Sequence, residues 1–226
     1  MIVAVAQIIR SDKRIRIALA TIGVLTVAAV AGWILWSAAR GDTEDPGGLA
    51  RGKVEHVRSG HKVVLDGGED VLYAGVRAPF QDEPLFDEAL KRNTELVGGK
   101  KVRLRFEETV KDKKDRLLAY VFADGVHVNE QLVREGLAYA QVTTSQRRFE
   151  KELLTAQNDA RKQKRGLWRL PTPPSETTYP ADPKYGSFHR PSCEEVPNIK
   201  PERLVTFPQR NKAFDSGFAP CHKCKP

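Results

Sequence analysis

The 226-residue chain is predicted to be an α+β protein, built around a small five-stranded barrel with three helices over residues 50–170. Three observations support this fold class. Short strand-like segments open the domain, and later segments with apolar residues three and four apart predict amphipathic helices. Along the chain these segments follow the order β-β-β-α-β-β-α-α, which suits a barrel flanked by helices.

The first half of this domain is predicted to form three strands, at 51–58, 62–65 and 71–76. Gly60 stands at the first turn, where a glycine is well tolerated. The Asp-Gly-Gly stretch at 66–68 is a hairpin signal between the second and third strands. We therefore expect tight turns to join the three strands.

The second half is predicted to combine helices with two further strands. A helix is expected at 83–96, because its apolar residues recur on one face. Alternation in "GGKKVRLRF" (98–106) predicts a strand, and "RLLAYVFADG" (116–125) predicts another that ends in a turn. A short helix at 127–137 and an amphipathic helix at 145–165 complete the domain.

An uncharged, apolar segment at 17–39 precedes the barrel. As a helix it would span roughly 34 Å at ~1.5 Å per residue, enough for a hydrocarbon core of ~30 Å. Basic residues within 1–16 predict a cytoplasmic N-terminus, so the domains beyond the 40–49 linker would be exported from a single-pass membrane anchor. The alternative is a signal peptide cleaved near Ser37–Ala39, which would release a secreted protein.

A proline-rich linker is predicted at 171–184, followed by a separate small module at 185–226. Two pairs at short spacing could each hold one side of a tetrahedral zinc ion. The four residues are His189, Cys193, Cys221 and Cys224. A module this small has too little core to fold unaided, so structural zinc would contribute to its folding. A disulfide between two of the three cysteines is the alternative.

Two stretches of the barrel, "DRLLAYVFADGVHVNEQLVREGLAYA" (115–140) and "AQNDARKQKRGLW" (156–168), resemble the staphylococcal nuclease, or thermonuclease, family. The resemblance implies an OB-fold barrel and the cleavage of DNA or RNA with calcium. In such a site carboxylates hold the calcium ion, a glutamate orients the attacking water, and two arginines clamp the phosphate.

Four positions of this chain depart from the catalytic pattern of that family. His61 stands where the first metal carboxylate is expected, and Arg77 stands where the second is expected. Leu72 replaces one arginine of the clamp, and Phe80 replaces the glutamate. Arg116 is the catalytic residue that the matching motif retains. The resemblance thus implies a catalytically degenerate barrel, a pseudoenzyme in which calcium is not expected.

The module resembles the metal-binding domain of Ada-type DNA methylphosphotriester repair proteins, through "FHRPSC", "PERLVTF" and "GFAPCHKCKP". In that family four cysteines bind zinc, and the first of them accepts the methyl group. His189 occupies that first position here. Because an imidazole cannot replace the accepting thiolate, the resemblance implies a structural zinc site without the repair reaction.

The net charge of +8 favours an anionic partner. We predict a non-catalytic module that binds nucleic acid or another polyanion at the former phosphate cleft. The basic residues expected there are Lys62, Arg77, Lys111, Lys113, Lys114 and Arg116. Three alternatives stay open: a nuclease with a rearranged site that uses Asp82 and Glu83, an interaction module for a cell-envelope protein, and a surface that is basic only for solubility.

Overall fold

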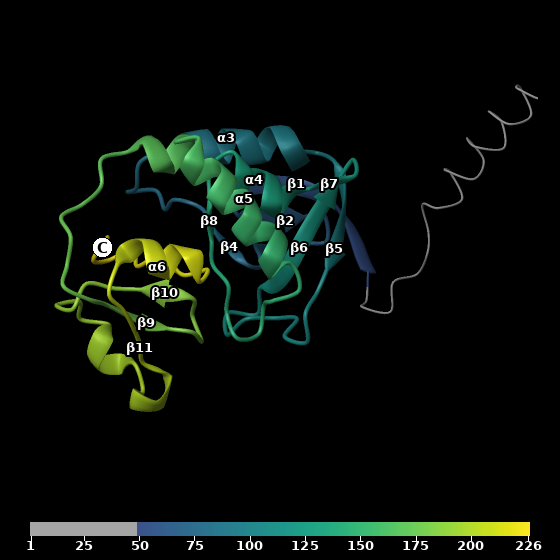
Figure 1. Ribbon diagram of the computed structural model, residues 1–226. Coiled ribbons are helices and arrows are strands. Elements are labelled where there is room, and N and C mark those ends of the chain that lie inside the picture. The colour runs from purple at the N-terminus through teal and green to yellow at the C-terminus, as the bar shows by residue number, and fades with distance from the viewer. Residues whose placement is uncertain (1–48) are drawn as a thin grey trace, which may run out of the picture. The chain divides into compact units, whose positions relative to one another are not determined.

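The computed structural model describes residues 49–226, which belong to one compact unit (Figure 1). The predicted five-stranded barrel with helices is confirmed. Its strands are β1 (Leu49–Ser59), β2 (Lys62–Leu65), β3 (Asp70–Tyr73), β5 (Lys101–Arg105) and β6 (Leu117–Ala123).

The barrel closes through a long first strand and one parallel pair. β1 pairs antiparallel with both β2 and β5. A register shift between Val54 and His56 accompanies its passage from one neighbour to the other, as a β-bulge does when it bends a strand. β3 then lies parallel to β6, with Leu72 opposite Leu118, so the sheet has no gap between its third and last barrel strands.

The three predicted helices are also present, as α3 (Phe86–Val97), α4 (Val128–Arg134) and α5 (Glu150–Lys162). α3 begins three residues later than the pattern predicts. Leu85, just before it, has a φ of 66°, in the left-handed region that cannot continue a right-handed helix. The predicted helix at 145–165 likewise shortens to α5, because its first residues form turns.

Buried apolar side chains from the strands fill the barrel. They include Val54, Val63, Val71, Tyr73, Val102, Leu104, Ala119 and Val121. One polar link crosses this core: Tyr73 Oη donates to Asn93 Oδ1 at 2.9 Å, and Asn93 Nδ2 donates to the Ser59 carbonyl at 2.8 Å. The link ties α3 to the barrel and supplies partners for groups that would be costly to bury alone.

The predicted strand at 71–76 divides into β3 and the short β4 (Val76–Arg77). Two further short strands of the barrel domain, β7 (Val126–His127) and β8 (Tyr139–Ala140), were not predicted from the sequence. β4 and β8 form a two-stranded sheet in which Arg77 lies opposite Tyr139. A strand of two residues is too short to show alternation, so its pairing becomes visible only in the structure.

The C-terminal module contains a four-stranded sheet in the order β11-β9-β10-β12, with the short helix α6 (Arg210–Asp215). The strands are β9 (Tyr179–Asp182), β10 (Ser187–Phe188), β11 (Val205–Phe207) and β12 (Ala219–Pro220). Three 3-10 turns, η2 (Gly166–Arg169), η3 (Val196–Asn198) and η4 (Pro201–Arg203), complete the described elements.

β9 differs from the sequence-based expectation, because it falls inside the range 171–184, for which the sequence predicts a linker. The prolines of this range make it resemble an extended spacer. Pro180 has no N–H to donate, but its carbonyl accepts a hydrogen bond from the His189 N–H at 2.8 Å. A proline can thus occupy a strand wherever only its carbonyl is needed.

The module packs against the barrel and does not stand apart from it. Phe214 of α6 lies against Tyr139 of β8 and Trp168 of η2, with ring centroids 5.8 and 4.8 Å away. The buried amide of Gln157 on α5 donates to the Phe214 carbonyl at 2.9 Å. Aromatic packing and a buried hydrogen bond therefore join two parts that the sequence presents as separate.

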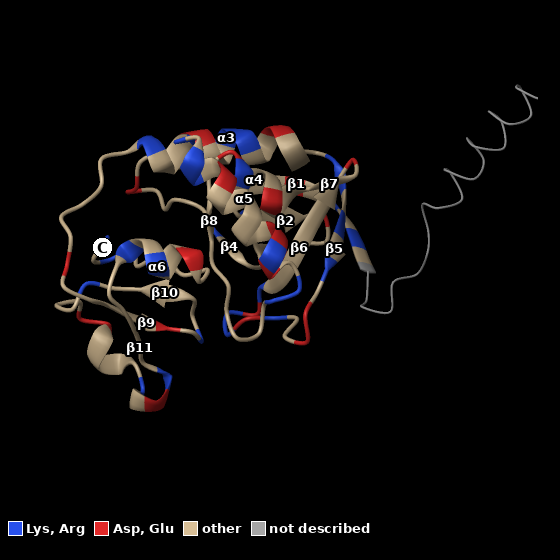
Figure 2. Ribbon diagram, in the orientation of Figure 1, with Lys and Arg blue, Asp and Glu red and all other residues tan. Residues whose placement is uncertain are grey.

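Charged residues of both signs are interspersed along α3 and α5 (Figure 2). The first turn of α3 carries Asp87 and Glu88, and the last turn of α5 carries Arg161 and Lys162. Acids near an N-terminus and bases near a C-terminus both interact favourably with the helix dipole. Part of the high charge content therefore stabilises individual helices.

The predicted membrane anchor at 17–39 lies outside the described residues. Among residues 49–226, no helix is both long enough and apolar enough to cross a membrane. Even α5 has only 13 residues, about 20 Å at 1.5 Å per residue, and it carries several charges. This finding contradicts the predicted single-pass membrane location. The single-pass location is therefore not retained.

Candidate functional site

A cavity of ≈ 460 Å³, the cleft, lies between the barrel and the module. The barrel contributes the four departing positions and the retained arginine: His61, Leu72, Arg77, Phe80 and Arg116. The module forms the opposite wall, which includes Asp182, Tyr185, Ser187, His189, Cys221 and His222. Residues far apart in the sequence thus meet in one space.

Arg77 places a buried cation in the cleft. It is only 4 % exposed, and β4 holds it against Tyr139, whose ring centroid is 5.5 Å from the guanidinium carbon. Its Nη2 donates to Glu83 Oε1, and the Phe80 ring lies 5.1 Å from the guanidinium. Its Nη1 is buried and has no hydrogen-bond partner among the described residues. Glu83 therefore offsets the charge of the guanidinium, and one of its buried donors lacks a partner among the described residues.

The two acids considered for a rearranged nuclease site are both in ion pairs. Glu83 binds Arg77 through one oxygen, and its other oxygen accepts from the Phe80 N–H at 2.9 Å. Asp82 accepts from Lys225 Nζ at 2.9 Å, near the surface. Each carboxylate already has a cation of the chain as its partner, so the pair is poorly placed to ligate a metal.

His61 is a neutral group of the cleft. Burial lowers the pKa of His61 to about 3, and the positive charges of Arg77, Arg116 and Lys62 add to this effect. Its Nδ1 lies 3.4 Å from the Ser59 hydroxyl. Near neutral pH the imidazole therefore carries no charge, and it offers neither the carboxylate of a calcium site nor a cation for an anion.

The lowered pKa of His61 predicts a loss of stability on acidification. Between pH 6.5 and about 3 the unfolded chain binds a proton at His61 that the folded chain does not bind. The free energy of unfolding should therefore fall as pH decreases through this window. His61→Gln should reduce that fall, as measured by urea unfolding at pH 7 and pH 5. His56→Gln, at a side chain that is 66 % exposed, is the matched control. Equal pH dependence in wild type and His61→Gln would contradict the lowered pKa of this histidine.

Two apolar residues occupy the positions expected for an arginine and a glutamate. Leu72 lies on β3 between Lys62 of β2 and Leu118 of β6. Phe80 is 39 % exposed, and its ring centroid lies 4.9 Å from that of His222 in the module. This contact links the two walls of the cleft through a pair of rings.

Arg116 is held in place by Asp112. Both Nε and Nη2 of Arg116 donate to Asp112 Oδ2, at 2.8 and 2.5 Å, and its backbone N–H donates to Oδ1 at 3.0 Å. Burial acts to raise the pKa of Asp112, but the hydrogen bonds from Arg116 outweigh it, and the pKa is lowered. The retained arginine is therefore pre-oriented at the cleft by a charged partner.

The structure brings only two of the six predicted basic residues into the cleft, Arg77 and Arg116. Lys62 lies nearby on β2, where it pairs with Asp70 at 3.2 Å. The other three lie on the loop that connects β5 to β6 and that also carries Arg116. They are Lys111, Lys113 and Lys114, all exposed. We call these three lysines the rim. They lie beside the cleft and do not line it.

The predicted ligand set of the module comes together in space. The side chains are His189, Cys193, Cys221 and Cys224, and their ligand atoms all lie within 4.8 Å of one another. No other group of three or more such residues forms a cluster in the described part of the chain. The parallel pairing of β10 with β12 explains the meeting, because His189 and Cys221 directly follow these two strands.

The chemistry of this set fits a tetrahedral metal ion such as zinc, which accepts imidazole and thiolate ligands. All three cysteines are free thiols, so the disulfide alternative is not what the structure shows. His189 Nε2 lies 3.2 Å from the Ser187 hydroxyl, and the Arg190 N–H donates to Cys224 Sγ at 3.3 Å. Such outer contacts orient metal ligands.

The metal-ligand cluster also borders the cleft, which sequence reasoning missed. His189 and Cys221 both line it, beside Tyr185 and Ser187, which belong to none of the sequence motifs. No spacing or composition signal connects these residues to His61 or to the other barrel positions. Only the packing of the module against the barrel relates them.

Comparison with known proteins places these observations in a family. The family model described as "Staphylococcal nuclease homologue" matches residues 70–170. Thermonuclease of Staphylococcus hyicus is 33% identical over 130 residues, which cover 51% of this chain and 74% of that protein. Endonuclease YncB of Bacillus subtilis is 35% identical over 116 residues, which cover 47% of this chain and 55% of that protein.

A further relative, the SPbeta prophage-derived endonuclease YokF of Bacillus subtilis, is 38% identical over 88 residues. These cover 38% of this chain and 30% of that protein. The chain thus spans about half of YncB and less than a third of YokF, but most of the Staphylococcus hyicus thermonuclease. The matched region contains most of the barrel, including β3, β4, β6 and the three helices. The chain therefore belongs to the family of staphylococcal nuclease homologues.

Proposed function

We propose that this chain is a non-catalytic member of its family, which binds nucleic acid or another polyanion and carries a structural zinc module. The observation that supports this most strongly is Arg77. The family resemblance places a metal carboxylate at this position, and the structure holds a buried, ion-paired guanidinium there.

A divalent ion next to Arg77 would be repelled. For an unpaired guanidinium, two like unit charges ~4 Å apart cost about 4 kcal/mol at an effective dielectric near 20, and a divalent ion doubles this. The ion pair with Glu83 offsets part of that repulsion and adds no free carboxylate. The barrel side of the cleft offers the neutral imidazole of His61 and no free carboxylate in compensation. On the module side, the carboxylates of Asp182 and Glu195 are already paired with Arg203 and Lys223. The residues present therefore do not fit calcium.

The rim on the β5–β6 loop is the proposed contact for a polyanion. Lys113 and Lys114 are exposed there, next to Arg116, which Asp112 holds in position. Lysines bind the phosphate backbone without reading sequence, so this surface would favour charge density over base identity. Relatives named as endonucleases and as a thermonuclease make nucleic acid the leading polyanion.

The zinc ion would be held by the imidazole of His189 and the three thiolates of Cys193, Cys221 and Cys224. Four protein ligands leave no open position for water, which is typical of a structural site. The ion would cross-link the ends of β10 and β12 to the loops that carry the other cysteines.

A nuclease assay tests the first half of the proposal. The full chain is incubated with DNA or RNA in calcium, magnesium or manganese, beside an Arg116→Ala variant. We expect no cleavage above that of the Arg116→Ala sample with any of the three metals. Metal-dependent cleavage that Arg116→Ala abolishes would refute the non-catalytic role.

Salt-dependent binding tests the second half. For single-stranded DNA, log K should fall linearly with log salt concentration, with a slope set by the number of phosphates that the protein neutralises. Lys113→Ala with Lys114→Ala should reduce the magnitude of the slope by about one for each lysine that binds a phosphate. Lys91→Ala, at an exposed lysine of α3, is the control and should leave the slope unchanged. Salt-insensitive binding, or an equal effect of Lys91→Ala, would count against the rim.

A further inference from the structure

A short segment of the module, residues 221–225, contacts the barrel at two points. We call this segment the knuckle. The ring centroid of His222 lies 4.9 Å from that of Phe80. Lys225 Nζ donates to Asp82 Oδ2 at 2.9 Å. Because the two contacts lie at different points of the knuckle, together they fix its position against the barrel.

Both contacts reach one turn of the barrel, residues 80–83, which we call the turn. The Glu83 N–H donates to the Phe80 carbonyl at 2.9 Å, and Glu83 Oε2 accepts from the Phe80 N–H at 2.9 Å. The same Glu83 side chain forms the ion pair with Arg77. The turn therefore connects the knuckle to the buried cation of the cleft.

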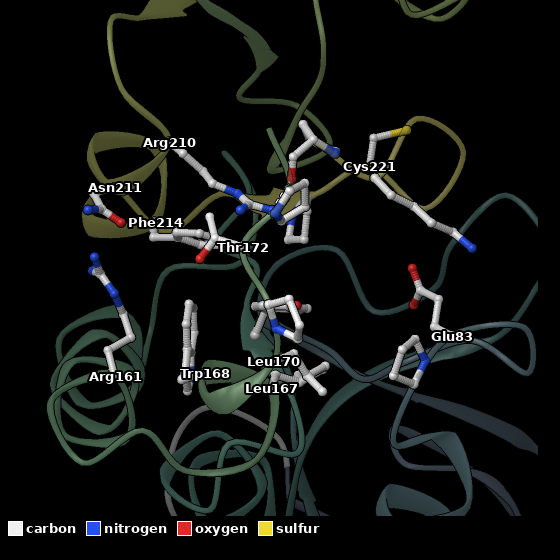
Figure 3. Close-up of a pocket in the computed structure, with 17 residues that line it drawn as sticks. Glu83, Arg161, Leu167, Trp168, Leu170, Thr172, Arg210, Asn211, Phe214 and Cys221 are labelled. Atoms are coloured by element: carbon white, nitrogen blue, oxygen red, sulfur yellow. Dashed lines mark hydrogen bonds between the residues drawn. The ribbon is translucent and has the colours of Figure 1, made fainter. Parts of the chain in front are cut away.

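The knuckle and the turn separate two cavities. Phe80 and His222 line the cleft. Glu83 and Lys225 line a second cavity, of ≈ 450 Å³, which lies between the end of the barrel domain and α6 (Figure 3). Figure 3 shows Cys221 and Glu83 on opposite sides at one end of this second cavity. Movement of the knuckle away from the turn would therefore open the cleft at this end.

The contact residues of the knuckle are direct neighbours of metal ligands along the chain. His222 follows Cys221, and Lys225 follows Cys224. Adjacent Cα atoms lie about 3.8 Å apart, so an ion that fixes both cysteines leaves the next residues little freedom to move. Arg190 adds to this constraint, because its Nε donates to the Cys224 carbonyl at 2.9 Å. The metal site and the barrel contacts thus constrain the same short segment.

We propose that the knuckle is a latch, which the metal ion of the module holds closed against the turn. The inference rests on the proposed zinc site. With zinc bound, His222 and Lys225 stay on the turn, and the cleft is bounded on both sides. When zinc leaves, Cys221 and Cys224 separate, and the two barrel contacts are lost together. Coupling of this kind is reciprocal, so the barrel contacts must also help to retain the metal.

The rate of zinc release tests the latch from the barrel side. Phe80→Leu combined with Asp82→Asn removes both contacts and changes no metal ligand. The zinc-loaded full chain is mixed with excess pyridylazoresorcinol, whose absorbance follows the released metal. We expect release about two- to tenfold faster than from wild type, which corresponds to the loss of one ring contact and one exposed ion pair. Asp87→Asn is the matched control, because it neutralises an exposed acid of α3 outside the turn and should leave the rate unchanged.

Hydrogen exchange tests the latch from the metal side. Deuterium uptake of the full chain is measured by mass spectrometry with zinc and after chelation. Peptides that contain the turn should exchange faster without zinc, whereas peptides of β5, which pairs only with barrel strands, should not change. The double variant should show the faster exchange of the turn even with zinc bound. This last comparison separates the latch from a general unfolding of the module.

The possible outcomes distinguish the latch from the zinc site itself. A wild-type chain that holds no zinc would overturn the zinc module, and the latch with it. Equal rates of zinc release from wild type and the double variant would overturn the latch alone, as would exchange of the turn that ignores metal removal. Circular dichroism checks that the double variant is folded. If it is not, Asp82→Asn alone, at a side chain that is 70% exposed, is compared with Asp87→Asn and should still release zinc faster.

Discussion

Cys193→Ser is expected to abolish metal binding and to unfold the C-terminal module. Cys193 is buried, and its sulfur lies 3.4 Å from His189 Nδ1, within the four-residue cluster. In small zinc domains the metal contributes about 10–16 kcal/mol of apparent folding free energy. The apolar core of the module is modest. That core and its packing against the barrel should therefore compensate only part of the lost folding free energy.

The measurements for this variant are the zinc content of purified protein and the near-ultraviolet circular dichroism of its aromatic rings. Wild type should contain one zinc per chain, and Cys193→Ser should contain none and lose most of the aromatic signal. His222→Gln is the matched control, because His222 lies between Cys221 and Cys224 in sequence but outside the cluster. A Cys193→Ser protein with unchanged metal content and spectrum would show that the cluster does not hold the module together.

The second large effect is expected from Glu83→Ala, which should destabilise the barrel by about 3–5 kcal/mol. The side chains of Arg77 and Glu83 are 5% and 11% exposed, so removal of the acid leaves a buried, uncompensated cation. The Phe80 N–H also loses its acceptor. Urea unfolding at pH 7, followed by far-ultraviolet circular dichroism, measures the change in the free energy of unfolding.

Two further variants test whether the loss of stability comes from the buried ion pair. Asp82→Ala breaks the exposed pair with Lys225 and should change stability little, since exposed ion pairs contribute little. Arg77→Met combined with Glu83→Leu should recover most of the loss, because apolar residues of similar volume often replace a buried ion pair without penalty. If Glu83→Ala is no more harmful than Asp82→Ala, Arg77 must be hydrated, and its role in excluding a metal ion would need revision.

Much of the barrel could be predicted from the sequence because its strands bury alternate side chains. Along β5, Val102 and Leu104 are buried, whereas the residues that alternate with them, Lys101 and Arg103, are exposed, and this alternation is visible in the sequence alone. The start of α3 was less predictable, because it depends on the left-handed backbone of Leu85. A single backbone torsion leaves no periodic trace.

The candidate site was predictable residue by residue but not as an assembly. Family resemblance led to His61, Leu72, Arg77, Phe80 and Arg116, which do line one cavity. The opposite wall came from the module, and nothing in its sequence indicates that it faces the barrel. The ion pair of Arg77 with Glu83 was equally hidden, because it depends on the turn that folds the residues after Phe80 back onto β4.

The packing of α6 against the barrel has a practical consequence for work on isolated parts of this protein. A fragment that ended at residue 170 would leave the rings of Tyr139 and Trp168 facing solvent, and the Gln157 amide would lose its carbonyl acceptor. Newly bared aromatic surface promotes self-association. Such a fragment would be a poor substitute for the intact chain, because its solubility and oligomeric state would reflect the cut and not the native molecule.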